Sequence, residues 1–114
     1  GINCFRAPSH MAETPPKPGE VFRLGGLVEE GSIQRGAGET ITFNVTDGGA
    51  VVPVRFTGVL PDLFGENQGM IGTGTMEGTV FVANEILAKH DESYMPKEVV
   101  DALKEQGVYK EPTS

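Results

Sequence analysis

The stretch TITFNVTDGGAVVPVRFTG, residues 40–58, decides the fold class of this chain. Apolar and polar side chains alternate over residues 40–46, which predicts a strand with one buried face. Alternation resumes after residues 47–49, an Asp-Gly-Gly sequence that tolerates the positive φ angles of a tight turn. The stretch therefore predicts a β-hairpin, in which Pro53 marks an edge or a bulge of the second strand.

Further short strands are predicted on both sides of this hairpin. Upstream, an apolar run is interrupted by Gly25-Gly26, a pair that indicates a bulge or a sharp bend. Downstream, GMIGTGTMEG at residues 69–78 alternates small glycines with larger residues, a pattern that suits the tight interior of a closed barrel. TVFVA at residues 79–83 is the last clear strand signal. These elements predict an all-β chain that folds as a small OB-fold β-barrel, with a small open sandwich as the alternative.

The chain of 114 residues is long enough for one small domain. Residues 1–11, GINCFRAPSHM, differ from the rest and are interpreted as a cloning remnant outside the fold. Residues 12–19 form a predicted Pro-rich linker, and residues 20–90 form the OB-fold domain. Residues 91–114 are predicted to be a flexible C-terminal tail. Within it, a proline start, helical apolar spacing and a glycine stop predict a short helix that needs a partner or ligand to hold it.

Composition excludes several classes of function. The formal net charge of -7 argues against a nucleic-acid-binding surface, which needs clustered Lys and Arg. Cys4 and His10 lie in the interpreted remnant, so the predicted domain keeps no thiol and His90 as its one histidine. Metal sites built from Cys and His clusters are therefore excluded. No run of about 18 apolar residues is present, so the sequence predicts no membrane-spanning helix.

The stretch LAKHDESYMP, residues 87–96, places His90 and Tyr94 where the predicted barrel ends. A lone histidine usually satisfies only surface hydrogen bonds, and one imidazole with one phenol cannot complete an ordinary metal site. Haem is different, because its four porphyrin nitrogens leave only axial positions, and both residue types serve as axial ligands. Pro96 disfavours helix at Met95, so the pair is expected on an open segment. A general base at His90 is an alternative, without a second acting residue in the sequence.

The stretch GVLPDLFGENQG, residues 58–69, carries Leu60, Leu63 and Phe64 around a Pro-Asp turn. Two interpretations stay open. The stretch is either a loop that folds over the open end of the barrel or an apolar platform for a ligand.

Three stretches together carry a family resemblance: FRLGGLVEEGSI, VRFTGVLPDLFGENQGMIGTG and FVANEILAKHDESYMP. They closely resemble the CcmE family, the periplasmic haem chaperones of cytochrome c maturation, over roughly residues 21–96. The resemblance implies an OB-fold domain on the periplasmic side of the bacterial inner membrane, tethered by a single N-terminal transmembrane signal-anchor that is missing from this sequence. It also implies a carrier that is not an enzyme.

By this resemblance, His90 forms a transient covalent bond with a vinyl group of haem b, and Tyr94 ligates the haem iron. The implied partners are haem, a membrane haem-delivery complex, an ATP-driven haem-release complex, a haem lyase complex and apocytochrome c, with no nucleic acid. Lys89 and Arg55 are candidates for contact with the haem propionates. The competing hypothesis is a generic OB-fold module for single-stranded nucleic acid or oligosaccharide, which the acidic balance and the lack of tryptophan disfavour.

Overall fold

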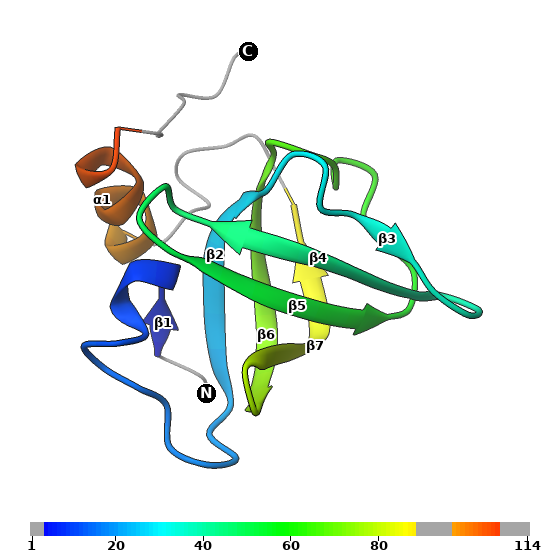
Figure 1. Ribbon diagram of the computed structural model, residues 1–114, viewed down its shortest axis with the longest axis horizontal. Coiled ribbons are helices and arrows are strands. Elements are labelled where there is room, and N and C mark those ends of the chain that lie inside the picture. The colour runs from blue at the N-terminus through cyan, green and yellow to red at the C-terminus, as the bar shows by residue number, and fades with distance from the viewer. Residues whose placement is uncertain (1–3, 89–96, 108–114) are drawn as a thin grey trace.

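The computed structural model describes residues 4–88 and 97–107 (Figure 1). Its elements are, in chain order, β1 (Phe5–Arg6), η1 (Pro8–His10), β2 (Phe22–Val28), β3 (Gln34–Arg35), β4 (Thr40–Thr46), β5 (Val51–Thr57), β6 (Gly69–Glu77), β7 (Val80–Leu87) and α1 (Lys97–Glu105). The strands form one sheet in the order β1-β2-β6-β7-β5-β4-β3. A second pairing of β2, with β4, closes five of these strands into a ring. The prediction of an all-β OB-type barrel is confirmed, and the open sandwich is wrong.

The predicted hairpin is β4 and β5, which pair antiparallel from Thr40↔Thr57 to Thr46↔Val51. Burial alternates along both strands, as the sequence predicted. Asn44 directs its backbone away from β5, because its N–H donates to Ser32 Oγ and its C=O accepts from Glu29 N–H. Pro53 lies opposite Asn44 and so removes no hydrogen bond from this ladder. Because β7 pairs with β5 only from Val54 onward, the predicted edge position of Pro53 is confirmed.

Glycines on β6 allow the ring to close tightly. A Cβ at Gly72 would lie 3.2 Å from the ring of Phe81 and 3.3 Å from Cε of Met70. At Gly74 a Cβ would collide with the carbonyl oxygen of Val82, because the register of β6 and β7 shifts at this point. The predicted role of these small residues in the barrel interior is confirmed.

The interior of the ring is a single apolar cluster. Its buried members are Phe22, Leu24, Val28, Ile41, Phe43, Val45, Val52, Val54, Phe56, Met70, Phe81, Ala83 and Ile86. Every strand of the closed ring contributes to this cluster, so burial of apolar surface holds the ring together.

The interpretation of residues 1–11 as a segment outside the fold is wrong for its described part. Strand β1 pairs parallel with β2, and Ala7 is fully buried. Arg6 donates to the Thr14 carbonyl oxygen at 2.6 Å, and its guanidinium lies 4.8 Å from the centre of the Phe22 ring. The sequence misled because a strand of two residues has no periodicity of its own, and β1 exists only through its pairing with β2.

Asp47, in the turn of the β4–β5 hairpin, is fully buried and ties the N-terminal segment to the barrel. Its carboxylate accepts hydrogen bonds from the Ser9 N–H, the Ser9 hydroxyl, and the Gly49 and Ala50 N–H groups, at 2.8 to 3.1 Å. Burial raises the pKa of Asp47, but these four hydrogen bonds outweigh it and hold the pKa below its ordinary value.

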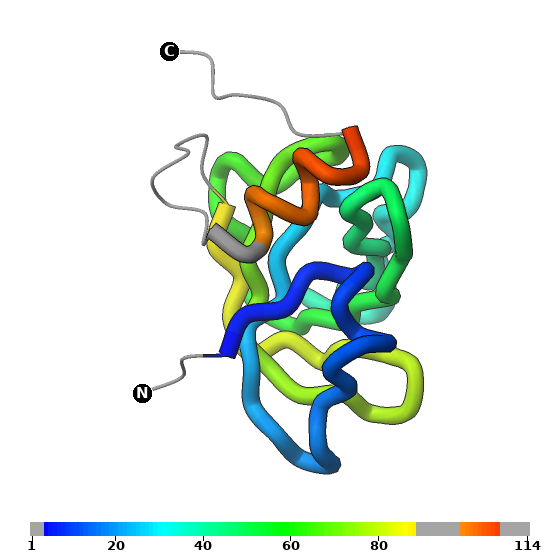
Figure 2. Tube along the Cα trace, turned by 90° about the vertical axis from the view of Figure 1, so that its left-hand side faces the viewer, coloured from blue at the N-terminus to red at the C-terminus, as the bar shows by residue number. Residues whose placement is uncertain are grey.

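The predicted short helix is present as α1, and Gly107 (φ 72°) follows its end as predicted. Four of its side chains are buried against the rest of the molecule: Val99, Val100, Ala102 and Leu103. Figures 1 and 2 show α1 on the outside of the barrel beside β1 and β2. The partner that a marginal helix needs is therefore the barrel itself.

Candidate functional site

The two predicted site residues, His90 and Tyr94, lie outside the described residues, as does Lys89. The structure does describe the chain on either side of them. Strand β7 ends at Leu87, Ala88 is buried, and the chain is described again from the start of α1. The candidate site is therefore the surface at the C-terminal end of β7, from which residues 89–96 depart.

An apolar row crosses the outer face of the sheet at this end. The strand register places Gly25 of β2, Ile71 of β6 and Leu87 of β7 side by side. Ile71 is 5% exposed although it belongs to the outer face, whereas Leu87 is 37% exposed. The next row along the same strands, Arg23, Thr73 and Glu85, is polar. The outer face thus changes from polar to apolar towards the end of β7.

The loop of residues 58–68 borders the end of β7, because parallel β5 and β7 finish at the same end of the barrel. Both views place this loop beside the last residues of β7 (Figures 1 and 2). Val59 and Leu63 of the loop are 85% and 44% exposed. We call Val59, Leu63 and Leu87 the exit surface. All three lie on elements at the same end of the barrel, where exposed apolar side chains can form a binding site for an apolar ligand or partner.

The same loop is held to the barrel core by two of its apolar side chains. Leu60 and Phe64 pack against the core, and the Phe64 ring lies edge-on to Phe43 with 4.9 Å between centroids. The Phe64 N–H donates to the Pro61 carbonyl oxygen, as expected for the predicted turn. The first interpretation is confirmed for Leu60 and Phe64, which pack against the core. Val59 and Leu63 are exposed, and the ligand platform stays a prediction.

Arg55, the other candidate for propionate contact, lies away from Leu87 at the end of β7. It pairs with Val82 in the sheet, and Leu87 lies five residues further along β7, a span of about 17 Å. Its guanidinium forms an ion pair with Glu77 at 3.5 Å. This position makes Arg55 a poor candidate for contact with a ligand held at Leu87.

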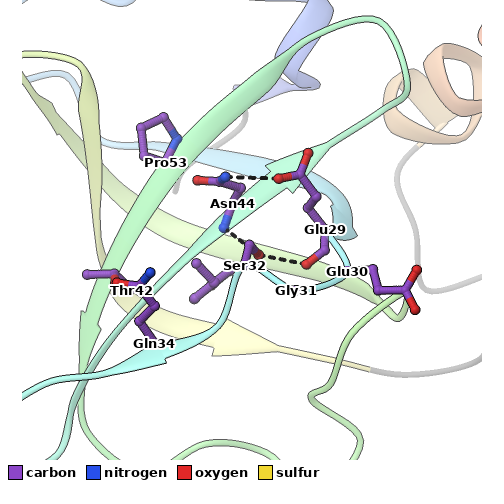
Figure 3. A pocket seen from close by; sticks show the side chains of 9 residues that line it. Glu29, Glu30, Gly31, Ser32, Gln34, Thr42, Asn44 and Pro53 are labelled. Atoms are coloured by element: carbon purple, nitrogen blue, oxygen red, sulfur yellow. Dashed lines mark hydrogen bonds between the residues drawn. The ribbon is translucent and has the colours of Figure 1, made fainter.

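A polar pocket of about 350 Å³ lies on a different part of the molecule, where the loop between β2 and β3 covers β4 (Figure 3). The Glu29 side chain accepts from Asn44 Nδ2 at 3.0 Å, and Ser32 Oγ donates to the Glu29 carbonyl oxygen at 2.6 Å. These bonds fix the loop on β4. Carboxylate-lined and polar, this pocket suits an apolar, dianionic ligand such as haem less well than the exit surface does.

Two further features bear on the chemistry of the described residues. No three His, Cys, Asp or Glu side chains among residues 4–88 and 97–107 gather to hold a metal ion. Across these same ranges, no helix has the length and apolar character to cross a membrane.

Sequence reasoning found the exposed loop but missed the apolar row and the pocket. Gly25, Ile71 and Leu87 are far apart in sequence and become neighbours only through the strand register. A pattern within any one strand could not have revealed them.

Comparison with known proteins gives a consistent result. Residues 2–97 match the family model described as the CcmE domain. The "cytochrome c-type biogenesis protein CcmE" of Paracoccus denitrificans is 77% identical over 114 residues, covering 100% of this chain and 78% of that protein. Its namesake in Rhodobacter capsulatus is 72% identical over 112 residues, covering 98% and 75%. The Paracoccus match includes residues 1–11, which does not fit a cloning remnant.

Solved structures show the same fold. The OB-fold domain of the haem chaperone CcmE from Desulfovibrio vulgaris has a TM-score of 0.55 and 23% identity, covering 67% of this chain and 93% of that one. A replication protein A heterotrimer bound to single-stranded DNA also gives 0.55, with 17% identity, covering 68% and 62%. At these identities the likeness extends to the fold alone.

Proposed function

Because the chain belongs to the CcmE family of cytochrome c-type biogenesis proteins, we propose that it is a haem chaperone that binds haem b covalently and transiently through His90 and hands it to apocytochrome c. It acts as a carrier and not as an enzyme. The observation that carries the proposal is the position of the sequence LAKHDESYMP. It begins at Leu87, the exposed apolar last residue of β7.

The chemistry of His90 suits a reversible link. With a reference pKa of about 6.5, imidazole is largely neutral near pH 7 and offers a nucleophilic nitrogen. Addition of its N–H across a vinyl double bond forms one C–N bond and moves the proton to the neighbouring vinyl carbon, so the step needs no oxidant. The reverse reaction restores the vinyl group, which apocytochrome thiols then attack.

Tyr94 is proposed as the axial ligand of the haem iron. Ferric iron favours the deprotonated phenol oxygen and draws its pKa down from about 10, whereas reduction to ferrous iron weakens this ligand. Iron redox state would then gate release. Tyr94→Phe should change the spectrum of bound haem and uncouple transfer from reduction; an unchanged spectrum with unchanged transfer would refute this role.

The exit surface supports the proposal by its chemistry. A porphyrin is a large planar apolar group, and Val59, Leu63 and Leu87 offer it exposed apolar contact beside the start of the His90 segment. We also propose that the protein lies on the periplasmic side of the inner membrane and is held there by an N-terminal anchor. Its proposed partners are a membrane haem-delivery complex, an ATP-driven haem-release complex, a haem lyase complex and apocytochrome c.

The test is the mass of the protein under denaturing conditions. A membrane-anchored form is co-expressed with the maturation machinery, and the protein with His90 intact is compared with His90→Ala. Both proteins keep residues 1–11, because β1 and η1 belong to the fold, and both carry Cys4→Ser to remove the exposed thiol. A haem-sized increment that survives denaturation and disappears in His90→Ala supports the proposal. Its absence from the protein with His90 intact, with machinery active on another carrier, refutes covalent binding.

A further inference from the structure

Helix α1 meets β2 through a contact that requires glycine. A Cβ at Gly25 would lie 2.8 Å from Cγ2 of Val99, closer than real Cβ atoms approach carbon, and 3.1 Å from Cγ1, which is a tight contact. A change of Val99 rotamer would still leave one methyl group facing Gly25, because both methyl groups now face it. Val99 itself has no exposed surface. The absence of a side chain at Gly25 therefore leaves a space that Val99 of α1 fills. We call this space the seat of α1.

A second glycine leaves room for the C-terminal end of α1. A Cβ at Gly49, in the β4–β5 turn, would lie 2.7 Å from Cδ of Gln106. The Gln106 N–H donates to the Ala102 carbonyl oxygen at 3.2 Å, which completes the last turn of the helix. The two ends of α1 are thus fixed against β2 and against the β4–β5 turn.

The seat of α1 lies close to the end of β7. Gly25 and Leu87 are separated in the apolar row by β6 alone, a distance of about 10 Å at the usual strand spacing. The eight residues 89–96 could extend to about 29 Å. When α1 is docked, the chain therefore returns to the outer face that it leaves at Leu87. The distance to be bridged is much shorter than the extended length of the connecting residues.

We propose that the contact between Gly25 and Val99 positions the haem-attachment segment by docking α1, an inference that rests on the proposed function of His90. With α1 docked, the segment is tied to one face of the barrel at both ends, which raises the effective concentration of its side chains at the exit surface. With α1 undocked, the segment is tied only at β7. Gly25 and Val99 are thus positioning residues that touch no haem.

A size-exchange pair of variants tests this role. Gly25→Ala introduces the clash, and Val99→Ala on that background removes the methyl groups that cause it. Gly36→Ala is the matched control, because a Cβ there would meet its nearest neighbour at an ordinary 3.5 Å. Val99→Asp undocks the helix from its own side and leaves β2 unchanged. Amide hydrogen exchange over residues 99–105 reports docking, and thermal unfolding reports the barrel.

Two haem readouts accompany these measurements: titration of the apoprotein with haemin, and the covalent yield in cells. We expect Gly25→Ala and Val99→Asp to lose the protection of α1 and to weaken haemin binding roughly tenfold, with a lower covalent yield. The double variant Gly25→Ala, Val99→Ala should recover both protection and haemin affinity. Gly36→Ala should match wild type throughout.

The inference is overturned if Gly25→Ala leaves α1 protected, or if α1 loses protection while haemin affinity and covalent yield stay at wild-type values. Failure of the double variant to restore affinity while restoring protection also contradicts it. A wild type that docks α1 but never acquires covalent haem overturns the proposed function, and the positioning role with it. The exchange data separate this outcome from a failure of docking.

Discussion

Replacing Asp47 with asparagine should destabilise the protein by about 2–3 kcal/mol. The asparagine carbonyl oxygen can replace Oδ1, which accepts from the Ser9 hydroxyl and from the Gly49 and Ala50 N–H groups. Its amide nitrogen would take the place of Oδ2 and face the Ser9 N–H, a donor against a donor, where the wild type has a bond of 2.9 Å. Loss of a hydrogen bond to a buried charged acceptor costs about 1.5–3 kcal/mol, and the three remaining bonds lose their charge assistance.

The assay is thermal unfolding followed by circular dichroism. For a domain of this size the melting temperature should fall by about 8–15 °C at pH 7. Asp62→Asn is the matched control, because Asp62 is exposed and the same loss of one negative charge there should change little. Asparagine has the same shape as aspartate, so no cavity contributes to the change in melting temperature of Asp47→Asn.

The pH dependence of the effect follows from the lowered pKa of Asp47. A carboxylate whose pKa is depressed by folding contributes stability that is fully present above its unfolded pKa of about 3.9 and is lost as the pH falls through its folded pKa. The gap between wild type and Asp47→Asn should therefore be constant from pH 5 to 7 and shrink below about pH 4. No gap at pH 7, or a gap unchanged in acid, would refute this account of Asp47.

Three other predictions follow from the site and the barrel. Gly74→Ala should abolish or severely weaken folding, because its Cβ would collide with the Val82 carbonyl oxygen; a native melting transition in that variant would contradict the closure geometry. Leu63→Asp should weaken haemin binding by about tenfold with an unchanged melting temperature, since the residue is exposed; equal affinity in a titration would remove the exit surface from the site. Arg55→Ala should leave haemin affinity unchanged and cost at most about 1 kcal/mol of stability, because its ion pair with Glu77 is half exposed; a large loss of affinity would restore Arg55 as a propionate contact.

The sequence predicted those parts of the fold that local patterns determine. Alternation along β4 and β5 and the turn residues between them specify the hairpin without any distant contact. Glycine alternation indicated the tight interior at β6, and helical spacing with Gly107 indicated α1. In each case the signal and the structure share the same short stretch of chain.

The remaining features depend on neighbours that are remote in sequence. Gly25-Gly26 predicted a bulge or bend, but Gly25 receives Val99, and a Cβ at Gly26 would meet the Thr46 carbonyl oxygen where the ring closes. The sequence indicates only a turn at Asp47, whereas the structure shows that Asp47 also accepts hydrogen bonds from Ser9. These roles depend on the strand register and on the packing of α1 and the N-terminal segment against the barrel. Neither can be recognised from a pattern within a short stretch of sequence.

The partners of β2 constrain the order in which the molecule can be assembled. This strand lies near the start of the chain, yet it pairs with β4 and β6 and receives α1 close to the end. Contacts between such distant residues form slowly, because long loops must close first. During synthesis from the N-terminus, β2 would therefore lack its partners until β4, β6 and α1 had emerged in turn. The contact between Gly25 and Val99 joins the most distant of these partners, so its formation closes a longer loop than the pairing of β2 with β4 or β6.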